Sequence, residues 1–306
     1  MYAFEKKGTF FHTLHPVTLL SYLLVVVIGT ILVTNPLILI GFMTTIVLCL
    51  IPSKSFNHWV KSLRIYFYMI VTMLIINLLI NNMGRTVLWV GPTLPVLGRI
   101  TLSLETIVFS LVMGLRLLII FSTFFLYNKV MDPDKALSVS SKIFPKSALL
   151  VALTTKTIPY MSQQLQSAAE IQQCRGVKYY SGSYIDRIKS RFPLIKVLLL
   201  SSLEDSFNLG ESIQARAYGS GKRSCYHTLT FRWRDYLVLL CSLLVLIGLS
   251  WSGVNGWIDM TFFPRIGKLI VSNQQLFVIL IIIFFMIAPV ILAWGWEKWD
   301  YLKLKI

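Results

Sequence analysis

Acidic residues are scarce in this chain: it has 13 Asp and Glu against 29 Lys and Arg, which gives a formal net charge of +16. Charged residues of both signs make up 14% of the 306 residues, whereas soluble domains contain about a quarter. Hydrophobic residues make up 56%. This balance excludes an ordinary soluble domain and indicates a protein that lies in a bilayer.

Residues that bind metals or form disulfides are also few. The four cysteines contain no Cys-x-x-Cys pair, and the four histidines are scattered without ligand spacing. These patterns predict no zinc site, no disulfide framework and no metal in this chain. A Walker phosphate-binding loop is missing too, because the nearest stretch, Gly219-Ser-Gly-Lys-Arg223, lacks the first glycine and a Ser or Thr after the lysine. We therefore expect that this chain does not hydrolyse ATP.

What the sequence has instead is a series of hydrophobic runs, most of them close to the about 20 residues that cross a bilayer as a helix. They predict an all-α polytopic membrane protein with about six transmembrane helices. A turn rather than a cleavage site follows the first run, so we interpret that run as a membrane helix and not as a secretory signal. The runs are Val17 to Val33, Leu37 to Ile51 (the shortest), Leu63 to Ile80, Ile107 to Tyr127, Tyr236 to Trp251 and Gln275 to Trp294.

One charged residue, Arg116, lies well inside a hydrophobic run. A charge in the middle of a membrane span is costly and is a functional hypothesis by default. The other runs contain no acidic residue that could pair with it. We favour a structural role for Arg116, such as bonding to a buried polar group.

The basic residues predict the orientation of the chain, because cytoplasmic loops of membrane proteins are enriched in Lys and Arg. Six spans place both termini on one side, and the segment from Asn128 to Asp235 on that side contains sixteen Lys and Arg. The same bias explains the net charge, so we predict no nucleic-acid partner. The opposite loops contain four basic residues: Arg85, Arg99, Arg265 and Lys268.

This orientation predicts three parts. Residues 1–127 form a membrane domain of four helices, residues 128–235 form cytoplasmic helices between the fourth and fifth spans, and residues 236–306 add two membrane helices and a short cytoplasmic tail. Both termini are expected in the cytoplasm.

The cytoplasmic segment is expected to be helical. Asp132-Pro133 predicts a helix start, since aspartate caps free backbone N–H groups and proline suits the first position. Two longer helices are predicted to begin at Phe144-Pro145 and Phe192-Pro193, with Pro159 bending the first. The distance along the chain is 30 residues from Pro145 to Arg175 and 23 residues from Pro193 to Arg216. We therefore expect two arms of unequal length. Gly176 and Gly219 are the expected caps.

One pattern, Glu-x-x-Gln-small-Arg-small, occurs at the end of each predicted arm. A helix cap accounts for one arginine before a glycine, but not for two matched sets. Small neighbours let a partner surface close around a guanidinium, which donates up to five hydrogen bonds in a fixed fork. We therefore favour docking over capping. The copies are Glu170-Ile-Gln-Gln-Cys-Arg-Gly176 and Glu211-Ser-Ile-Gln-Ala-Arg-Ala217.

With these residues the chain resembles the transmembrane coupling component (T component, EcfT/CbiQ-like) of energy-coupling factor transporters. The resemblance covers most of the chain: His15-Pro16 before the first span, Asn35-Pro36 between the first two, Asp132-Pro133 after the fourth, and the paired motifs. The family carries two Ala-Arg-Gly-like signatures. Here they are Cys174-Arg175-Gly176 and Ala215-Arg216-Ala217, and neither is a perfect match.

The resemblance implies a non-catalytic subunit of a micronutrient importer in a bacterial or archaeal cell membrane. Its partners would be two ATP-binding-cassette ATPases, which bind the ATP and Mg²⁺, and a small membrane subunit that captures the substrate. No cofactor is expected in this chain. Vitamins are the first expectation for the cargo and nickel or cobalt ions the second. The implied docking residues are Arg175 and Arg216 with Cys174, Gly176, Ala215 and Ala217 beside them, and Glu170, Gln173, Glu211 and Gln214 in support.

The apolar first halves of the arms are the implied platform for the substrate-capturing subunit. Packing against this chain's own spans is an equal alternative. The residues concerned are Ala148, Leu149, Leu153, Leu194, Val197 and Leu198.

Two other functions remain open at this point. Ala168-Ala169-Glu170 hints at the coupling loop of an ordinary ATP-binding-cassette permease, but such a loop usually occurs once. An integral membrane enzyme acting on lipid would need clustered carboxylates, histidines or a nucleophile, and the acidic residues here are spread out.

Overall fold

The computed structural model describes residues 9–53, 55–80, 86–94, 98–177, 184–221, 230–263, 267 and 273–298. The chain forms two compact units. The first combines Met1–Lys135 with Leu229–Ile306, and the second is Ala136–Thr228. We call them the membrane unit and the arm unit. Arg85, Arg265, Lys268 and both termini lie outside the described residues, and the cytoplasmic orientation stays a prediction.

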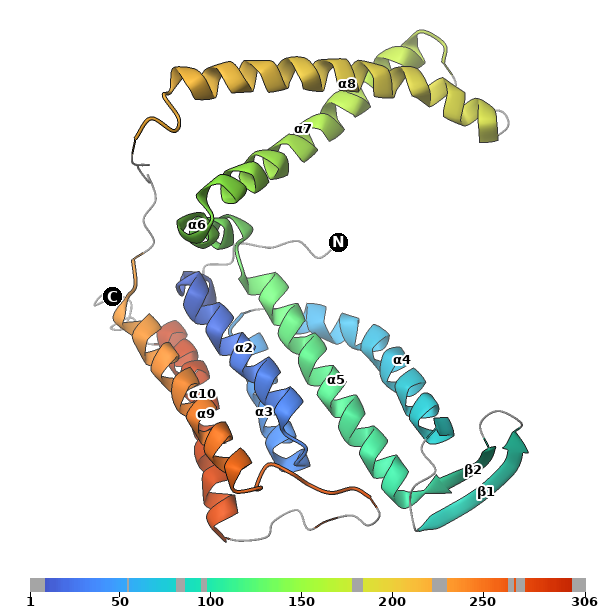
Figure 1. The fold of residues 1–306 in the computed structure, drawn as a ribbon, viewed down its shortest axis with the longest axis vertical. Helices are drawn as coiled ribbons and strands as arrows, with labels where there is room; N and C mark the ends of the chain where they lie inside the picture. The colour runs from blue at the N-terminus through green and yellow to red at the C-terminus, as the bar shows by residue number, and fades with distance from the viewer. Residues whose placement is uncertain are drawn as a thin grey trace. The chain divides into compact units, whose positions relative to one another are not determined.

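The membrane unit is a bundle of apolar helices that coincide with the six predicted runs, which confirms the all-α polytopic fold. Four of them, α4, α5, α9 and α10, are long and apolar enough to cross a membrane, while α2 and α3 are shorter. In Figure 1, α4 lies beside α5 at one edge of the bundle, and α5 also contacts α2 and α3. The helices are α1 (Phe10–Thr13), α2 (Pro16–Leu32), α3 (Pro36–Leu50), α4 (Phe56–Ile80), α5 (Leu104–Val130), α9 (Trp233–Val254) and α10 (Asn273–Lys298).

Three helices begin with the same device, a polar residue followed by proline. His15, Asn35 and Asp132 each accept a hydrogen bond from the backbone N–H two residues on, at 3.3, 3.0 and 3.1 Å. Each following proline takes the first helical position, where its missing N–H costs nothing. The predicted start at Asp132 is therefore confirmed, and the helix that it opens is α6 (Pro133–Ile143).

A two-stranded antiparallel sheet between α4 and α5 was not predicted from the sequence. It consists of β1 (Val87–Leu94) and β2 (Gly98–Ser103). Its base is fixed to α5 by Glu105, which is 2% exposed. The carboxylate of Glu105 accepts from Oγ1 of Thr86 at 2.7 Å and from the backbone N–H of Thr86 at 3.3 Å.

The arm unit contains two long helices, α7 (Pro145–Cys174) and α8 (Tyr184–Ala215). The start of α7 at Phe144-Pro145 is confirmed, but the predicted start of α8 is wrong, because Pro193 lies inside that helix. The residues before it, 184–192, contain neither glycine nor another proline, so the helix extends through the one lost hydrogen bond. The two helices have 30 and 32 residues and are nearly equal, contrary to the expected inequality.

The two arms cross and contact each other, and their C-terminal ends lie on opposite sides of the crossing (Figure 1). Pro159 lies inside α7, which continues as a helix through it. The bend expected there stays a prediction.

Candidate functional site: two matched arm tips

The end of α7 is a complete Schellman motif, in which the two residues after the cap bond back to the last turn. Arg175 is the C-cap. Gly176 follows with φ of 88°, in the left-handed region that favours glycine. The Gly176 N–H donates to the carbonyl of Gln173 at 2.9 Å, and the Val177 N–H donates to that of Gln172 at 3.1 Å. The predicted glycine cap at Gly176 is confirmed.

The end of α8 repeats this motif with an alanine in place of the glycine. Ala217 has φ of 54°, a left-handed value that costs a non-glycine residue about 1–2 kcal/mol. Its N–H donates to the carbonyl of Gln214 at 2.8 Å, and the Tyr218 N–H donates to that of Ile213 at 3.2 Å. The cap predicted at Gly219 is therefore wrong. Ala217 takes the capping position, and Gly219 adopts its own φ of 96° two residues later.

The two arginines thus occupy the same structural position. Each comes directly after the last helical residue, Cys174 or Ala215, and directly before a left-handed residue. The structure brings each set of five together on one helix end, and it keeps the two sets apart because the ends of α7 and α8 lie on opposite sides of the crossing (Figure 1). All ten predicted docking residues are exposed: Glu170, Gln173, Cys174, Arg175, Gly176, Glu211, Gln214, Ala215, Arg216 and Ala217.

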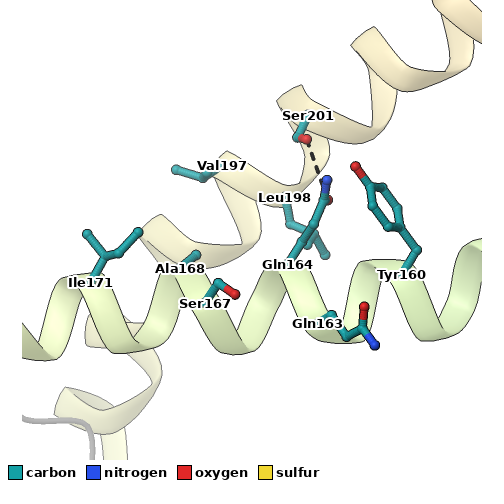
Figure 2. Close-up of a pocket in the computed structure, with 9 residues that line it drawn as sticks. All are labelled: Tyr160, Gln163, Gln164, Ser167, Ala168, Ile171, Val197, Leu198 and Ser201. Carbon is teal, nitrogen blue, oxygen red and sulfur yellow. Dashed lines mark hydrogen bonds between the residues drawn. The ribbon is translucent and has the colours of Figure 1, made fainter.

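A groove of about 440 Å³ lies where the arms cross, and it was not predicted from the sequence. Figure 2 shows that Gln164 of α7 points toward Ser201 of α8. The Ser201 Oγ donates a hydrogen bond to the Gln164 Oε1 at 3.5 Å. Small residues on both arms, such as Ala168 and Ser201, are the sequence signal for such a close approach. The groove is lined by Tyr160, Gln163, Gln164, Ser167, Ala168, Ile171, Val197, Leu198 and Ser201.

The six residues predicted as a platform do not form one exposed surface. Ala148 and Leu194 are each 7% exposed. Packing of these residues against the chain's own spans stays a prediction. Val197 and Leu198 line the groove at the crossing. Leu149 and Leu153 are half-buried. The large apolar side chains that the arms do expose include Leu150, Val151, Ile158, Ile195, Leu199, Leu200, Leu203 and Phe207.

Arg116 of α5 bonds to a backbone carbonyl and to a methionine sulfur rather than to an acidic residue. Its Nη2 donates to the carbonyl of Val33, the C-cap of α2, at 2.8 Å, and its Nη1 contacts Sδ of Met113 at 3.3 Å. A cation suits this position because the C-terminal end of a helix carries partial negative charge. The bond agrees with the structural role that the sequence favoured. A backbone acceptor leaves no mark in a sequence, which is why its partner could not be named.

Known proteins provide an independent comparison. The family profile described as "Cobalt transport protein", CbiQ, matches residues 7–227. The chain is 27% identical over 223 residues to an energy-coupling factor transporter transmembrane protein, EcfT, of Brevibacillus brevis, covering 70% of this chain and 82% of that protein. It is 23% identical over 264 residues to the EcfT of Staphylococcus aureus, covering 81% of this chain and 95% of that protein. With the EcfT of Listeria innocua it shares 35% identity over 103 residues, 33% of this chain and 38% of that one. The chain therefore belongs to the EcfT/CbiQ-like family of transporter transmembrane proteins.

Proposed function

We propose that this chain is the coupling subunit of an energy-coupling factor importer and that Arg175 and Arg216 each dock on one of two ATPase subunits. The observation that carries the proposal is the repetition of one tip geometry at two exposed helix ends, down to the left-handed residue after each arginine. A cap that served only its own helix would not need the same Glu, Gln and small residues at the same offsets twice. Family membership supports the same interpretation.

The left-handed turn gives each arginine its chemical role. The chain leaves the helix directly after the arginine, which is exposed and has small residues on both sides. A guanidinium presents donors in a rigid planar fork, which suits carboxylates or backbone carbonyls lining a partner groove. Glu170 and Glu211 lie more than a turn earlier on the same arms and offer an acceptor to the same partner.

Motion is proposed to pass through the crossing of α7 and α8. ATP and Mg²⁺ bind to the partner ATPases, and their movement relative to each other changes the angle between the arms. The exposed apolar side chains of the arms, such as Leu199 and Phe207, would contact the substrate-capturing membrane subunit. That subunit selects the cargo, for which a vitamin is the first candidate and a nickel or cobalt ion the second. The arms would then lie in the cytoplasm beside the cell membrane.

The test is charge reversal at both tips. We expect Arg175→Glu with Arg216→Glu to abolish co-purification of the ATPase pair and ATP-driven uptake, because each tip loses its donors and gains repulsion. Truncating one partner of a buried charge pair costs about 2–5 kcal/mol, a loss of roughly 30-fold or more in affinity. The matched control is Lys156→Glu with Lys189→Glu, which makes the same charge change at exposed positions on the same arms. Unchanged assembly and uptake in the tip variant would refute docking.

A further inference from the structure

Seven residues directly before α2 form a further feature of the membrane unit. Residues Thr9–His15 contain the four-residue helix α1, which is too short to be stable by itself. Nevertheless Phe10 and Phe11 are each 2% exposed. Since the helix cannot hold this segment in place, its contacts with the rest of the membrane unit must do so.

One of these contacts is made at the point where the chain leaves the membrane unit. Lys135, in the first turn of α6, donates from Nζ to the backbone carbonyl of His12 at 2.7 Å. This carbonyl belongs to the last turn of α1. The lysine is half-exposed.

A second set of contacts is made at the point where the chain returns from the arms. The carboxylate of Asp235 accepts from the backbone N–H of His15 at 2.8 Å and from that of Arg232 at 2.9 Å. It therefore satisfies donors at the start of both α2 and α9, where helix dipoles favour negative charge. Asp235 is 3% exposed, and charge-assisted bonds of this kind are about twice as strong as neutral ones.

The neighbouring residue adds a third contact on the same segment. Arg234 donates from Nη1 to Oγ1 of Thr13 at 3.2 Å, and its guanidinium lies 5.7 Å from the centre of the Phe10 ring. The His15 ring stacks on Phe231 at 3.9 Å between centroids. One short segment thus contacts both connections between the two units.

We propose that residues 9–15 act as a clamp that joins the two connections to the arm unit, so that arm motion reaches the membrane helices instead of being absorbed where the chain passes between units. This inference rests on the coupling function proposed above. Lys135, Arg234 and Asp235 are positioning residues in it, because they act through their contacts with residues 9–15 of this chain. The arms join the membrane unit at two places along the chain. If those places could shift independently, a change in arm angle would move the connections and leave the membrane helices where they are.

The first test measures the clamp without any partner protein. In the full-length chain in lipid nanodiscs, Lys135→Met should raise amide exchange at residues 9–15 and also at residues 230–236, by about fivefold, the effect of one lost hydrogen bond. Lys135→Arg keeps the donor and should restore protection. Lys61→Met is the matched control, because Lys61 is exposed on α4. Faster exchange at residues 9–15 without faster exchange at residues 230–236 would show that the two connections are independent, and the clamp would be overturned.

The second test uses the complete transporter. Lys135→Met and Asp235→Asn should leave co-purification of the ATPases and their ATP hydrolysis intact, while uptake per ATP falls about fivefold, the lower end of usual coupling between sites. A merely structural role would lower complex yield and ATP hydrolysis together with uptake. Unchanged uptake per ATP in both variants would refute the clamp. Failure of the unaltered chain to bind ATPases would instead refute the proposed function, and the exchange experiment would still decide the clamp.

Discussion

Gly176 and Ala217 occupy the same position in two copies of one helix-ending motif, each directly after an arginine and each in the left-handed conformation, with φ of 88° and 54°. Only glycine adopts this conformation without a steric cost. The second tip therefore carries a strain that the first lacks.

This asymmetry predicts that Ala217→Gly stabilises the end of α8. Relief of the left-handed strain exceeds the extra chain entropy of glycine, so we expect a gain of about 0.5–1 kcal/mol. Amide exchange at Tyr218, which bonds back to Ile213, would be slower. Ala215→Gly is the control, because Ala215 is the last helical residue and glycine there should weaken the helix. Faster exchange in Ala217→Gly would contradict the assignment.

Removal of the Arg116 donor should destabilise the membrane unit. In Arg116→Met the carbonyl of Val33 loses its bond, and a hydrogen bond to a charged group contributes about 1.5–3 kcal/mol. The measurement is thermal unfolding of the purified chain in detergent. Arg64→Met provides the comparison, because Arg64 is exposed on α4. Equal unfolding temperatures for the two variants would argue against the bond.

Close packing between α3 and α10 predicts a pair of coupled substitutions. A Cβ added at Gly41 would lie 2.7 Å from side-chain atoms of Ile283, closer than real contacts allow. Gly41→Ala should therefore cost about 1–3 kcal/mol. Combined with Ile283→Ala it should cost less than the sum of the two single changes, measured as a double-mutant cycle of thermal stability. Strict additivity would show that the helices are not in contact there.

The groove at the arm crossing predicts a variant that separates docking from transport. Ala168→Leu places a larger side chain in the groove, so it should alter the crossing of α7 and α8 while both tips remain intact. We expect normal co-purification of the ATPases and a lower uptake per ATP. Ser162→Leu, at an exposed position of α7 outside the groove lining, is the control.

A distance measurement checks the structural part of this prediction. Spin labels on Cys174, which is free and exposed, and on Ala215→Cys would report the separation of the two tips, with Cys225 changed to serine. Ala168→Leu should shift or broaden the distance distribution, and Ser162→Leu should not. An unchanged distribution in Ala168→Leu would show that the groove does not set the crossing.

Hydrophobic runs predicted the helices of the membrane unit well, because burial in lipid requires continuous apolar sequence. The Asp132-Pro133 pair located the start of α6 because the cap and the ring act within two residues. The sheet formed by β1 and β2 was missed, since β2 has only six residues and Pro92 lies within β1. The start of α8 was misplaced because a proline inside a helix and a proline at its first position look alike in a sequence.

The tip residues were predictable for a similar reason, since the motif is local and occurs twice. The position of the second cap was not, because the sequence rule expects glycine and the structure uses Ala217. Contacts between distant segments left no signal at all. Neither the bond from Lys135 to His12 nor the bonds to Asp235 could be inferred from patterns along the chain.

The crossing of the arms divides them unequally, although their lengths are similar. Seven residues separate Ala168 from Arg175, about 10 Å along α7, whereas eighteen separate Leu198 from Arg216, about 27 Å along α8. No proline lies in either stretch. Under the docking proposed above, rotation of the arms about this crossing would move the Arg216 tip through a longer arc than the Arg175 tip. The two ATPases would then experience different forces.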